Sequence, residues 1–574
     1  MAVPGPSLLR ARTVPHRLRT LPATLISARG RLVIQSILLL ACLAVFALAA
    51  VQLRVYERDV RRDTFTLGGS IPVPVLRFTP VGRPLNVVAV IAHGYSADKE
   101  MMSSFGVDLA KQGITTYAFD LPGHGASTVP YTTAGVKEVV PRLVTSVGEV
   151  VDFALAHGPA PGTQLVLIGY SLGTIAAGDY ALEHPNMSAL KATVLVAGVL
   201  TDRLTLTTPR DLLVLTGQFD LPGINDTAVR MMVTACGVPF ASVTDTFHCQ
   251  GADPTAQRMR MVLPGLDHVG IVTAASTHAA LLSWLRQTVD SRIGASPVDA
   301  DARLRWLLVG VLAAGLALLP LLGLAASALG LAGGGVRADS KSAGRLATWR
   351  DGVALIMALV LGLAALRLWL PWDFFAPGPW PFGFLAQQVS VDVSAYFLVS
   401  GVALLVALRF VPALRGALVL PERWSALKQL LLAGGAVLFL YLTVGRLSGF
   451  AWENLTLSPE RLWRAGVYTL MAWPFFLGLR TIVEAAARRF GRGWPADLGA
   501  TLLVVAALIA AIIFNFGRLS YLGILLPIVA IVLLAFIGIA TWTRRLAPRS
   551  ILLTSVMQSL ILGWLFAATL PLLA

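Results

Sequence analysis

Charged residues and cysteines are scarce in this sequence, and acidic residues are scarcer than basic ones. Charged residues make up 13% of the 574 residues, whereas hydrophobic residues make up 56%. A chain that is soluble throughout rarely has this composition. The composition therefore predicts that a large part of the chain lies in a membrane.

The three cysteines, Cys42, Cys236 and Cys249, show neither CxxC nor mixed Cys/His spacing, which argues against a zinc site. No metal or organic cofactor is predicted. Cys236 and Cys249 flank a short polar segment. They can form a disulfide worth about 3 kcal/mol if this segment faces an oxidising compartment. Two unpaired thiols are the alternative.

The formal net charge is +15, from 46 Lys and Arg residues against 31 Asp and Glu residues. Such an excess can indicate nucleic-acid binding. Here, however, the basic residues occur in short clusters between apolar runs, where they act as topology signals. No nucleic-acid partner is predicted.

The amino-terminal region has the pattern of a signal anchor. Residues 1–31 hold several arginines and no acidic residue, and the apolar run from Leu32 to Val51 can cross about 30 Å of hydrocarbon. Ala47-Leu48-Ala49 resembles a signal-peptidase site, but the long leader and long core favour an uncleaved anchor over residues 32–52. The leader is then cytoplasmic, and residues 53–303 are exported.

Residues 304–574 are predicted to form an all-α polytopic membrane domain. Alternate loops between its apolar runs carry clusters of basic residues, whereas the loop from Pro371 to Asp392 has none. With the anchor this predicts nine spans in the plasma membrane, with the amino terminus in the cytoplasm and the carboxyl terminus outside. The eight predicted spans are Leu304–Leu331, Val353–Leu370, Val393–Leu408, Ala426–Val444, Val467–Val483, Leu498–Phe516, Tyr521–Trp542 and Ile551–Leu573.

Residues 53–303 alternate short β-rich runs with helical stretches, which predicts a doubly wound, mostly parallel α/β sheet. Ligands of such sheets bind at the carboxyl ends of the strands. A leading hairpin is predicted between Thr64 and Phe78, and helices over Lys99–Gln112, Val139–Ala156, Thr174–Leu182 and Thr277–Val289. The other predicted strands are Val87–Ala92, Thr115–Phe119, Gln164–Ile168, Ala192–Val196, Leu212–Leu215 and Met259–Leu263.

The segment Gly169-Tyr170-Ser171-Leu172-Gly173 joins a predicted strand to a predicted helix. A sharp turn of this kind holds its central residue in a strained conformation above the sheet and requires small residues two positions to either side. Gly169 and Gly173 meet this requirement, so Ser171 is the candidate nucleophile.

The strand Val87–Ala92 ends in His93-Gly94-Tyr95. In acyl-transfer enzymes of this architecture, a loop at this point supplies one backbone N–H of the oxyanion hole, and the residue after the nucleophile supplies the other. The predicted donors are therefore Tyr95 and Leu172.

A serine nucleophile requires a base, and the base requires an acid that fixes its tautomer. Asp220 follows the predicted strand Leu212–Leu215, and His268 follows the next predicted strand. The chain order Ser, Asp, His is the order expected of this fold. Ser171, His268 and Asp220 are the predicted catalytic triad, with Asp267 and Asp245 as competing acids.

These motifs together resemble the α/β-hydrolases, nearest to the monoacylglycerol lipase and serine aminopeptidase-like branch. The resemblance covers about residues 64–290 and includes Asp120-Leu-Pro-Gly-His-Gly, which we interpret as scaffold with a structural His124. Relatives in that branch carry a cap domain, but here only Ala197–Arg210 is available for one. The predicted fold therefore lacks a large cap, and the crevice is either open or covered by the insert Ile224–Gln257.

The predicted function is that of a membrane-anchored serine hydrolase that cleaves a small-molecule or lipid-like acyl ester through an acyl-enzyme. The same triad can serve a peptidase or an acyltransferase, and a transporter or assembly protein with a binding domain is the rival class. The membrane domain is predicted to be an anchor and folding platform in contact with lipid, because its spans carry few ionisable residues near their middles. The alternative is a substrate guide, which the aromatic loop Trp369–Phe384, expected at the lipid interface, would provide.

Overall fold

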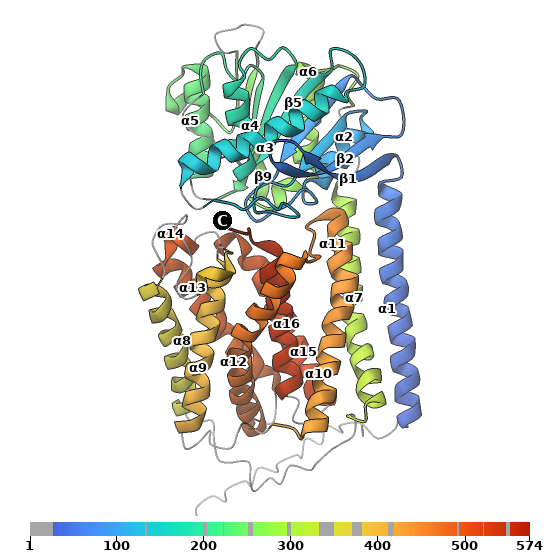
Figure 1. Ribbon diagram of the computed structural model, residues 1–574, viewed down its shortest axis with the longest axis vertical. Helices are drawn as coiled ribbons and strands as arrows, with labels where there is room; N and C mark the ends of the chain where they lie inside the picture. The colour runs from blue at the N-terminus through green and yellow to red at the C-terminus, as the bar shows by residue number, and fades with distance from the viewer. Residues whose placement is uncertain are drawn as a thin grey trace, which may run out of the picture.

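The computed structural model describes residues 27–132, 135–198, 204–221, 223–250, 256–294, 300–331, 349–369, 382–387, 389–410, 418, 420–490, 493–519, 522–546 and 551–573. Most of the predicted leader, residues 1–26, and most of the aromatic loop, residues 370–381, lie outside this set. An α/β domain stands on one end of a bundle of long helices, as Figure 1 shows.

The α/β domain contains one sheet of nine strands in the order β1-β2-β4-β3-β5-β6-β7-β9-β8. The five pairings among β4, β3, β5, β6, β7 and β9 are parallel, and β1, β2 and β8 are antiparallel. The strands are β1 (Val60–Gly68), β2 (Pro72–Pro80), β3 (Val87–Ala92), β4 (Thr115–Phe119), β5 (Gln164–Tyr170), β6 (Leu190–Val196), β7 (Leu212–Phe219), β8 (Thr246–Cys249) and β9 (Arg258–Asp267).

Helices cover both faces of this sheet, because its central strands are aliphatic on both sides. Val87, Ala89 and Ile91 of β3 face α2 (Ser103–Lys111) and α6 (Ala275–Thr288). Val88 and Val90 face the opposite layer, formed by α3 (Val136–Ala156) and α4 (Leu172–Glu183). The predicted doubly wound α/β fold is confirmed.

The insert that follows β7 extends the domain rather than forming a separate cap. Its helix α5 (Ile224–Cys236) packs on β6 and β7 through Ala228, Met231 and Met232. After the short η1 (Phe240–Ser242), β8 adds an antiparallel edge to β9. A disulfide joins Cys236 to Cys249, so this insert is also covalently closed. Neither α5 nor β8 was predicted. The strand β8 has only four residues, which is too short for a clear pattern.

The long helices are α1 (Ala28–Tyr56) before the α/β domain and the bundle after it. The 3-10 turns η2 (Gly270–Val272) and η3 (Phe382–Leu385) and the π-helical turn η4 (Tyr441–Gly445) are short. The remaining helices are α7 (Ala300–Ala328), α8 (Trp349–Trp369), α9 (Ser390–Phe410), α10 (Arg423–Leu440), α11 (Arg446–Ala451), α12 (Pro459–Phe490), α13 (Gly493–Phe514), α14 (Phe516–Leu519), α15 (Leu522–Leu546) and α16 (Ile551–Thr569).

Within the described residues, eight helices are long and apolar enough to cross a membrane: α1 and seven that overlap the predicted spans. The remaining predicted span, Val353–Leu370, corresponds to α8, which lies beside α9 in Figure 1 and has a shorter qualifying apolar stretch, Ile356–Ala365. The predicted span Ile551–Leu573 is too long, because α16 stops at Thr569. Pro571 explains this end, since proline lacks the N–H that would continue the helix.

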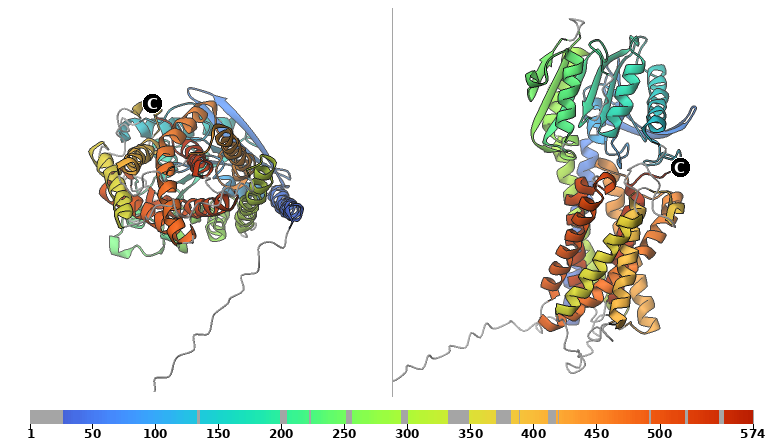
Figure 2. Two further views of the ribbon diagram at one scale, coloured as in Figure 1. Left: turned by 90° about the horizontal axis from the view of Figure 1, so that it is seen from below. Right: turned by 90° about the vertical axis from the view of Figure 1, so that its left-hand side faces the viewer.

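The α/β domain enters and leaves the bundle on neighbouring helices. α1 packs along α7 at the edge of the bundle, as the view from below in Figure 2 shows. Glu57, just after α1, accepts a hydrogen bond from Arg303 of α7 at 2.7 Å. Arg62 of β1 donates to the carbonyl oxygen of Gly449 in α11 at 2.7 Å. These contacts form the neck that joins the two parts.

Candidate active site

Ser171 lies on the sharp turn between β5 and α4, with φ of 49° and ψ of −115°. A non-glycine residue rarely adopts this left-handed region, so the turn is strained. A Cβ at Gly169 would lie 2.3 Å from the carbonyl oxygen of Gly173, and one at Gly173 would lie 2.2 Å from that of Ala92. Both glycines are therefore required by close backbone approach.

His268 follows β9 and contacts both other members of the predicted triad. Its Nε2 lies 3.0 Å from Ser171 Oγ, and its Nδ1 lies 2.6 Å from Asp220 Oδ1. A carboxylate can only accept, so Nδ1–H donates to Asp220 and leaves Nε2 to accept the Ser171 hydroxyl proton. This tautomer suits a general base.

The side chain of Asp220 is fully buried and is held by the backbone around it. It accepts hydrogen bonds from the N–H groups of Leu221 at 2.8 Å and Gly217 at 3.3 Å. The competing acid Asp267 is exposed and accepts from the N–H of Gly270 at 2.6 Å. Asp245, with a side chain 85% exposed, lies 3.6 Å from Arg260. The structure thus brings Asp220 to His268 and gives both competitors other partners.

Tyr170 is a further contact of the base that sequence reasoning missed. Its hydroxyl donates to the carbonyl oxygen of His268 at 2.9 Å, and the two ring centroids are 5.5 Å apart. It therefore positions the loop that carries the imidazole. Its place beside the serine in the turn was the only sequence signal.

His93 and Gly94 bring the turn after β3 against the nucleophile. His93 is fully buried; its Nε2 accepts from the N–H of Leu121 at 3.0 Å, so its Nδ1–H donates to the carbonyl oxygen of Gly94 at 2.7 Å. Burial lowers the pKa of His93 to about 4, which keeps the ring neutral. A Cβ at Gly94 would lie 3.0 Å from Ser171 Cβ. Only glycine fits this approach.

Tyr95 and Leu172, the predicted oxyanion donors, occupy the two sides of this approach. Tyr95 follows Gly94 in the turn after β3, and Leu172 is the first residue of α4. A helix amino terminus presents unpaired N–H groups and favours negative charge. Their N–H groups stay the predicted donors of the oxyanion hole.

The segment Asp120–Ser127 forms a scaffold around this turn. Asp120 pairs with the Lys99 ammonium at 2.7 Å, with both side chains buried, and accepts from the N–H of Ala126 at 2.9 Å. The buried His124 contacts the carbonyl oxygen of Pro122 at 2.8 Å, and burial lowers its pKa well below its ordinary value. Neither residue contacts the triad through any of these bonds.

The carboxyl edge of the sheet, where Ser171 lies, faces the helical bundle. Ser96 Oγ donates to the carbonyl oxygen of Thr569 at the end of α16 at 2.8 Å, and Asp98 accepts from the N–H of Asn454 at 2.7 Å. Tyr95 packs against the core of the bundle. The end of α16 and the loop between α11 and α12 thus contact this edge of the sheet.

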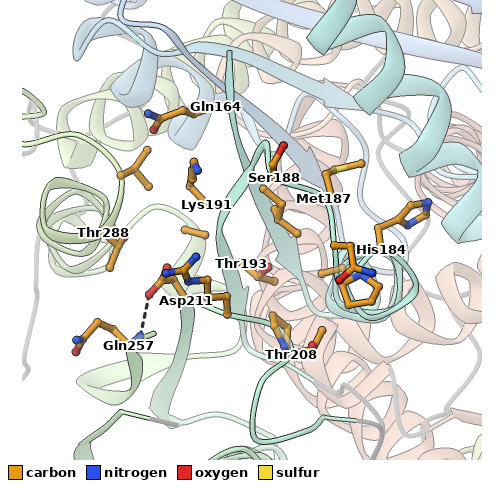
Figure 3. A pocket seen from close by; sticks show the side chains of 18 of the residues that line it. Gln164, His184, Met187, Ser188, Lys191, Thr193, Thr208, Asp211, Gln257 and Thr288 are labelled. Atoms are coloured by element: carbon orange, nitrogen blue, oxygen red, sulfur yellow. Dashed lines mark hydrogen bonds between the residues drawn. The ribbon is translucent and has the colours of Figure 1, made fainter. Parts of the chain in front are cut away.

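A pocket of about 570 Å³ lies at the opposite, amino edge of the sheet (Figure 3). Gln164, Lys191 and Asp211 line it, and none of the triad residues does. Gln164 begins β5 and Ser171 follows the end of β5, so about 20 Å separates the pocket from the nucleophile. In the described part of the chain, no group of three or more His, Cys, Asp or Glu residues could hold a metal ion.

Residues 83–224 match the family described as Serine aminopeptidase, S33. No curated protein matches the chain. Similar solved structures include a dienelactone hydrolase from Anabaena variabilis, with 17% identity, 40% of this chain and 99% of that chain covered, and a TM-score of 0.31. Another is an epoxide hydrolase from Vigna radiata, with 14% identity, 40% and 99% covered, and a TM-score of 0.29. With its sheet order, strained serine turn and family match, the chain is a hydrolase of the α/β-hydrolase fold joined to apolar helices.

Proposed function

We propose that the protein is a membrane-anchored serine hydrolase that cleaves acyl esters. One observation carries this proposal: the hydrogen-bonded series from Ser171 Oγ through His268 to Asp220, at 3.0 Å and 2.6 Å. This spacing allows a serine to be activated at neutral pH. The family match supports a hydrolase, and the ester substrate is our inference.

The reaction begins when His268 Nε2 takes the proton of Ser171 and Oγ attacks the ester carbonyl. The N–H groups of Tyr95 and Leu172 stabilise the resulting oxyanion, a contribution typically worth about 10²–10³ in kcat per donor. Collapse of the intermediate expels the alcohol, which takes the proton from His268. Water then attacks the acyl-enzyme by the same route, and Asp220 stabilises the imidazolium in both steps.

The depth of the site relative to the helices supports a lipid-like substrate. α16 has 19 residues and is therefore about 28 Å long, close to the hydrocarbon thickness of a bilayer. Its last residue, Thr569, bonds to Ser96, which lies two residues after the glycine that contacts Ser171. If the end of α16 marks the hydrocarbon boundary, the nucleophile lies about a nanometre from it, because two residues span about 7 Å. An amphiphilic ester held in the membrane reaches that level.

Two features support an α/β domain outside the plasma membrane. Arginines precede α1 without any acidic residue, a pattern that keeps the leader in the cytoplasm. The disulfide between Cys236 and Cys249 is typical of an oxidising compartment. Arg461 and Arg464, which the proposed topology places outside, are buried and donate to backbone carbonyl groups. Their charges therefore have structural partners.

The test is labelling of intact cells with a fluorophosphonate probe, which reports an activated serine and its exposure to the medium. We expect labelling of the wild type and none of Ser171→Ala or His268→Ala. Asp267→Asn is the matched control and should label normally. Labelling only after lysis would contradict the orientation. No labelling before or after lysis would contradict the enzyme and favour a binding or transport protein.

A serine aminopeptidase is the second candidate, because the matched family carries that description. Acyl transfer to an acceptor other than water uses the same residues. Purified full-length protein should be given p-nitrophenyl butyrate and an aminoacyl-naphthylamide in parallel. Faster turnover of the amide would replace the esterase proposal with the peptidase.

A further inference from the structure

We propose that the segment Thr569–Leu573, here called the strap, positions the turn that supplies the Tyr95 N–H. The turn, Gly94–Ala97, is here called the oxyanion turn. This inference rests on the proposed function, and it adds positioning residues that lie more than 470 positions from the turn in the sequence. It also gives the helical bundle a direct part in the rate.

The oxyanion turn contains a strained residue, Ser96. The N–H of Ala97 donates to the carbonyl oxygen of Gly94 at 3.2 Å, which closes a four-residue turn. Ser96 occupies its third position with φ of 61°, where such turns usually have glycine. Strained residues of this kind persist only where their surroundings fix them.

Ser96 is fixed by the helical bundle. Ser96 is only 9% exposed, and its hydroxyl donates to the carbonyl oxygen of Thr569 at 2.8 Å. That carbonyl is at the end of α16, where carbonyl groups lack partners within the helix. One hydrogen bond therefore satisfies the helix end and also holds the strained residue next to Tyr95.

The strap is itself held on two sides by backbone hydrogen bonds. Towards the α/β domain, the N–H of Leu572 donates to Gly123 and the N–H of Tyr131 donates to Leu572, each at 2.8 Å. Towards the bundle, the N–H of Leu573 donates to Ala386 at 2.7 Å. The strap thus bridges the loop after β4 and the segment before α9.

Arg461 locks the start of the strap from below. Only 3% of Arg461 is exposed. It donates to the carbonyl oxygens of Ala567 at 2.6 Å and Leu570 at 2.9 Å, and to that of Gly123 at 3.2 Å. The same cation therefore contacts the end of α16 and the loop of the α/β domain.

The aromatic ring of Tyr95 also connects the oxyanion turn to the strap, through Tyr131. It packs edge-on against His124 at 5.5 Å and Tyr131 at 6.0 Å between ring centroids. Tyr131 is the residue whose N–H donates to the strap. Tyr95 is therefore linked to the strap in two ways. Its ring packs on Tyr131, which donates to Leu572, and the neighbouring Ser96 donates to Thr569.

The first test replaces Ser96 in the full-length protein in nanodiscs, with kcat and KM measured on p-nitrophenyl butyrate. We expect Ser96→Ala to lower kcat about tenfold with KM unchanged, because the oxyanion forms only after binding and one hydrogen bond is lost. The acid limb of the kcat/KM profile, which reports the base, should not move. Ser96→Gly relieves the strain at φ of 61° but lacks the hydroxyl, so it should lose as much rate as the alanine variant.

Ser104→Ala is the matched control. Ser104 is also buried and donates its hydroxyl to a backbone carbonyl, that of Val272, at 3.0 Å. It lies in α2, away from the turn, so this variant should lose stability without losing kcat. An equal loss of kcat in Ser104→Ala and Ser96→Ala would overturn the inference.

The second test leaves the turn intact and changes the strap. Leu572→Pro removes the N–H that bonds to Gly123, and we expect a loss of kcat of about tenfold. Leu572→Ala keeps this N–H and should retain most of the rate. Wild-type kcat in both Ser96→Ala and Leu572→Pro would overturn this inference and leave the proposed function standing. A wild-type protein that turns over no ester would overturn the proposed function with it.

Discussion

The two edges of the sheet differ in backbone strain, although the same strands form both. At the carboxyl edge, Ser96, Ser171 and Ala197 follow β3, β5 and β6 with positive φ. Ala386, which is hydrogen-bonded to the strap, and Val389 are the other non-glycine residues with positive φ in the described ranges. The amino edge has a polar pocket but none of these residues (Figure 3).

This difference shows how a rigid sheet supports a reactive site. The amino edge can be open to solvent because none of its described non-glycine residues has a positive φ that would need outside support. The carboxyl edge holds strained residues in place with buried polar contacts from distant parts of the chain. Substitutions at the carboxyl edge should therefore lower the catalytic rate, whereas substitutions at the amino edge should lower the stability of the fold.

The largest expected effect is at the carboxyl edge. Asp220→Asn removes the carboxylate that fixes the His268 tautomer, so kcat should fall about 10⁴-fold with little change in thermal stability. Ester hydrolysis by the purified protein measures this. Lys191→Ala, in the pocket at the amino edge, should keep the wild-type rate. A comparable loss in that variant would abolish the distinction between the edges.

The disulfide tests the amino edge. Cys249 pairs with Arg258, the first residue of β9, so the bond lies towards that edge. Replacing Cys236 and Cys249 by serine should lower the free energy of unfolding by about 3 kcal/mol while kcat stays unchanged at low temperature. Thermal unfolding of Cys42→Ser, which removes the free thiol, is the control. A loss of kcat without a loss of stability would show that the disulfide supports the active site and not the stability of the amino edge.

Acid should weaken the carboxyl edge through its buried imidazole groups. The pKa of His93 is lowered to about 4 by burial, whereas the ordinary value is 6.5. Between these values the unfolded chain binds a proton that the folded chain does not, so stability falls as the pH falls below 6.5. From pH 7 to pH 5 the expected loss is about 2 kcal/mol. His124 acts in the same direction.

Thermal unfolding at both pH values checks this expectation. His93→Asn has no titrating group at this position, so its melting temperature should depend less on pH than that of the wild type. An unchanged dependence would assign the effect to other groups.

The smallest expected effect concerns Tyr170. Tyr170→Phe removes one hydrogen bond to the backbone of His268, and kcat should fall about fivefold. Tyr180→Phe, which changes a buried tyrosine of α4, is the control and should keep the rate. Steady-state kinetics on a short ester would show whether the two variants differ. Equal rates would exclude a positioning role for Tyr170.

The α/β fold and the residues around Ser171 were predictable because their signals are local. Each candidate residue follows a β-rich run, and the carboxyl ends of parallel strands meet at one edge. Gly169 and Gly173 identify the sharp turn without any knowledge of tertiary structure. The placement of Asp220 and His268 follows from the order of the strands.

The strap was not predictable for the opposite reason. Leu570 to Leu573 continue the apolar run of α16, so composition assigns them to the span, and only Pro571 signals that the helix ends. The partners Ser96 and Thr569 are brought together by the packing of whole helices. No local pattern encodes such a contact. The contacts of Tyr170 and Arg461 were not predictable either, because an aromatic residue and a basic residue have many ordinary roles.

The position of the strap also sets an order in time. The ribosome makes the α/β domain first, then the helices from α7 to α16, and the strap follows α16. A nascent chain that has already folded its triad therefore still lacks the contacts of Ser96 and Gly123 with the strap. Full activity would arise only after the bundle has been inserted and packed, so synthesis itself would delay the hydrolase until the last helix is in the membrane.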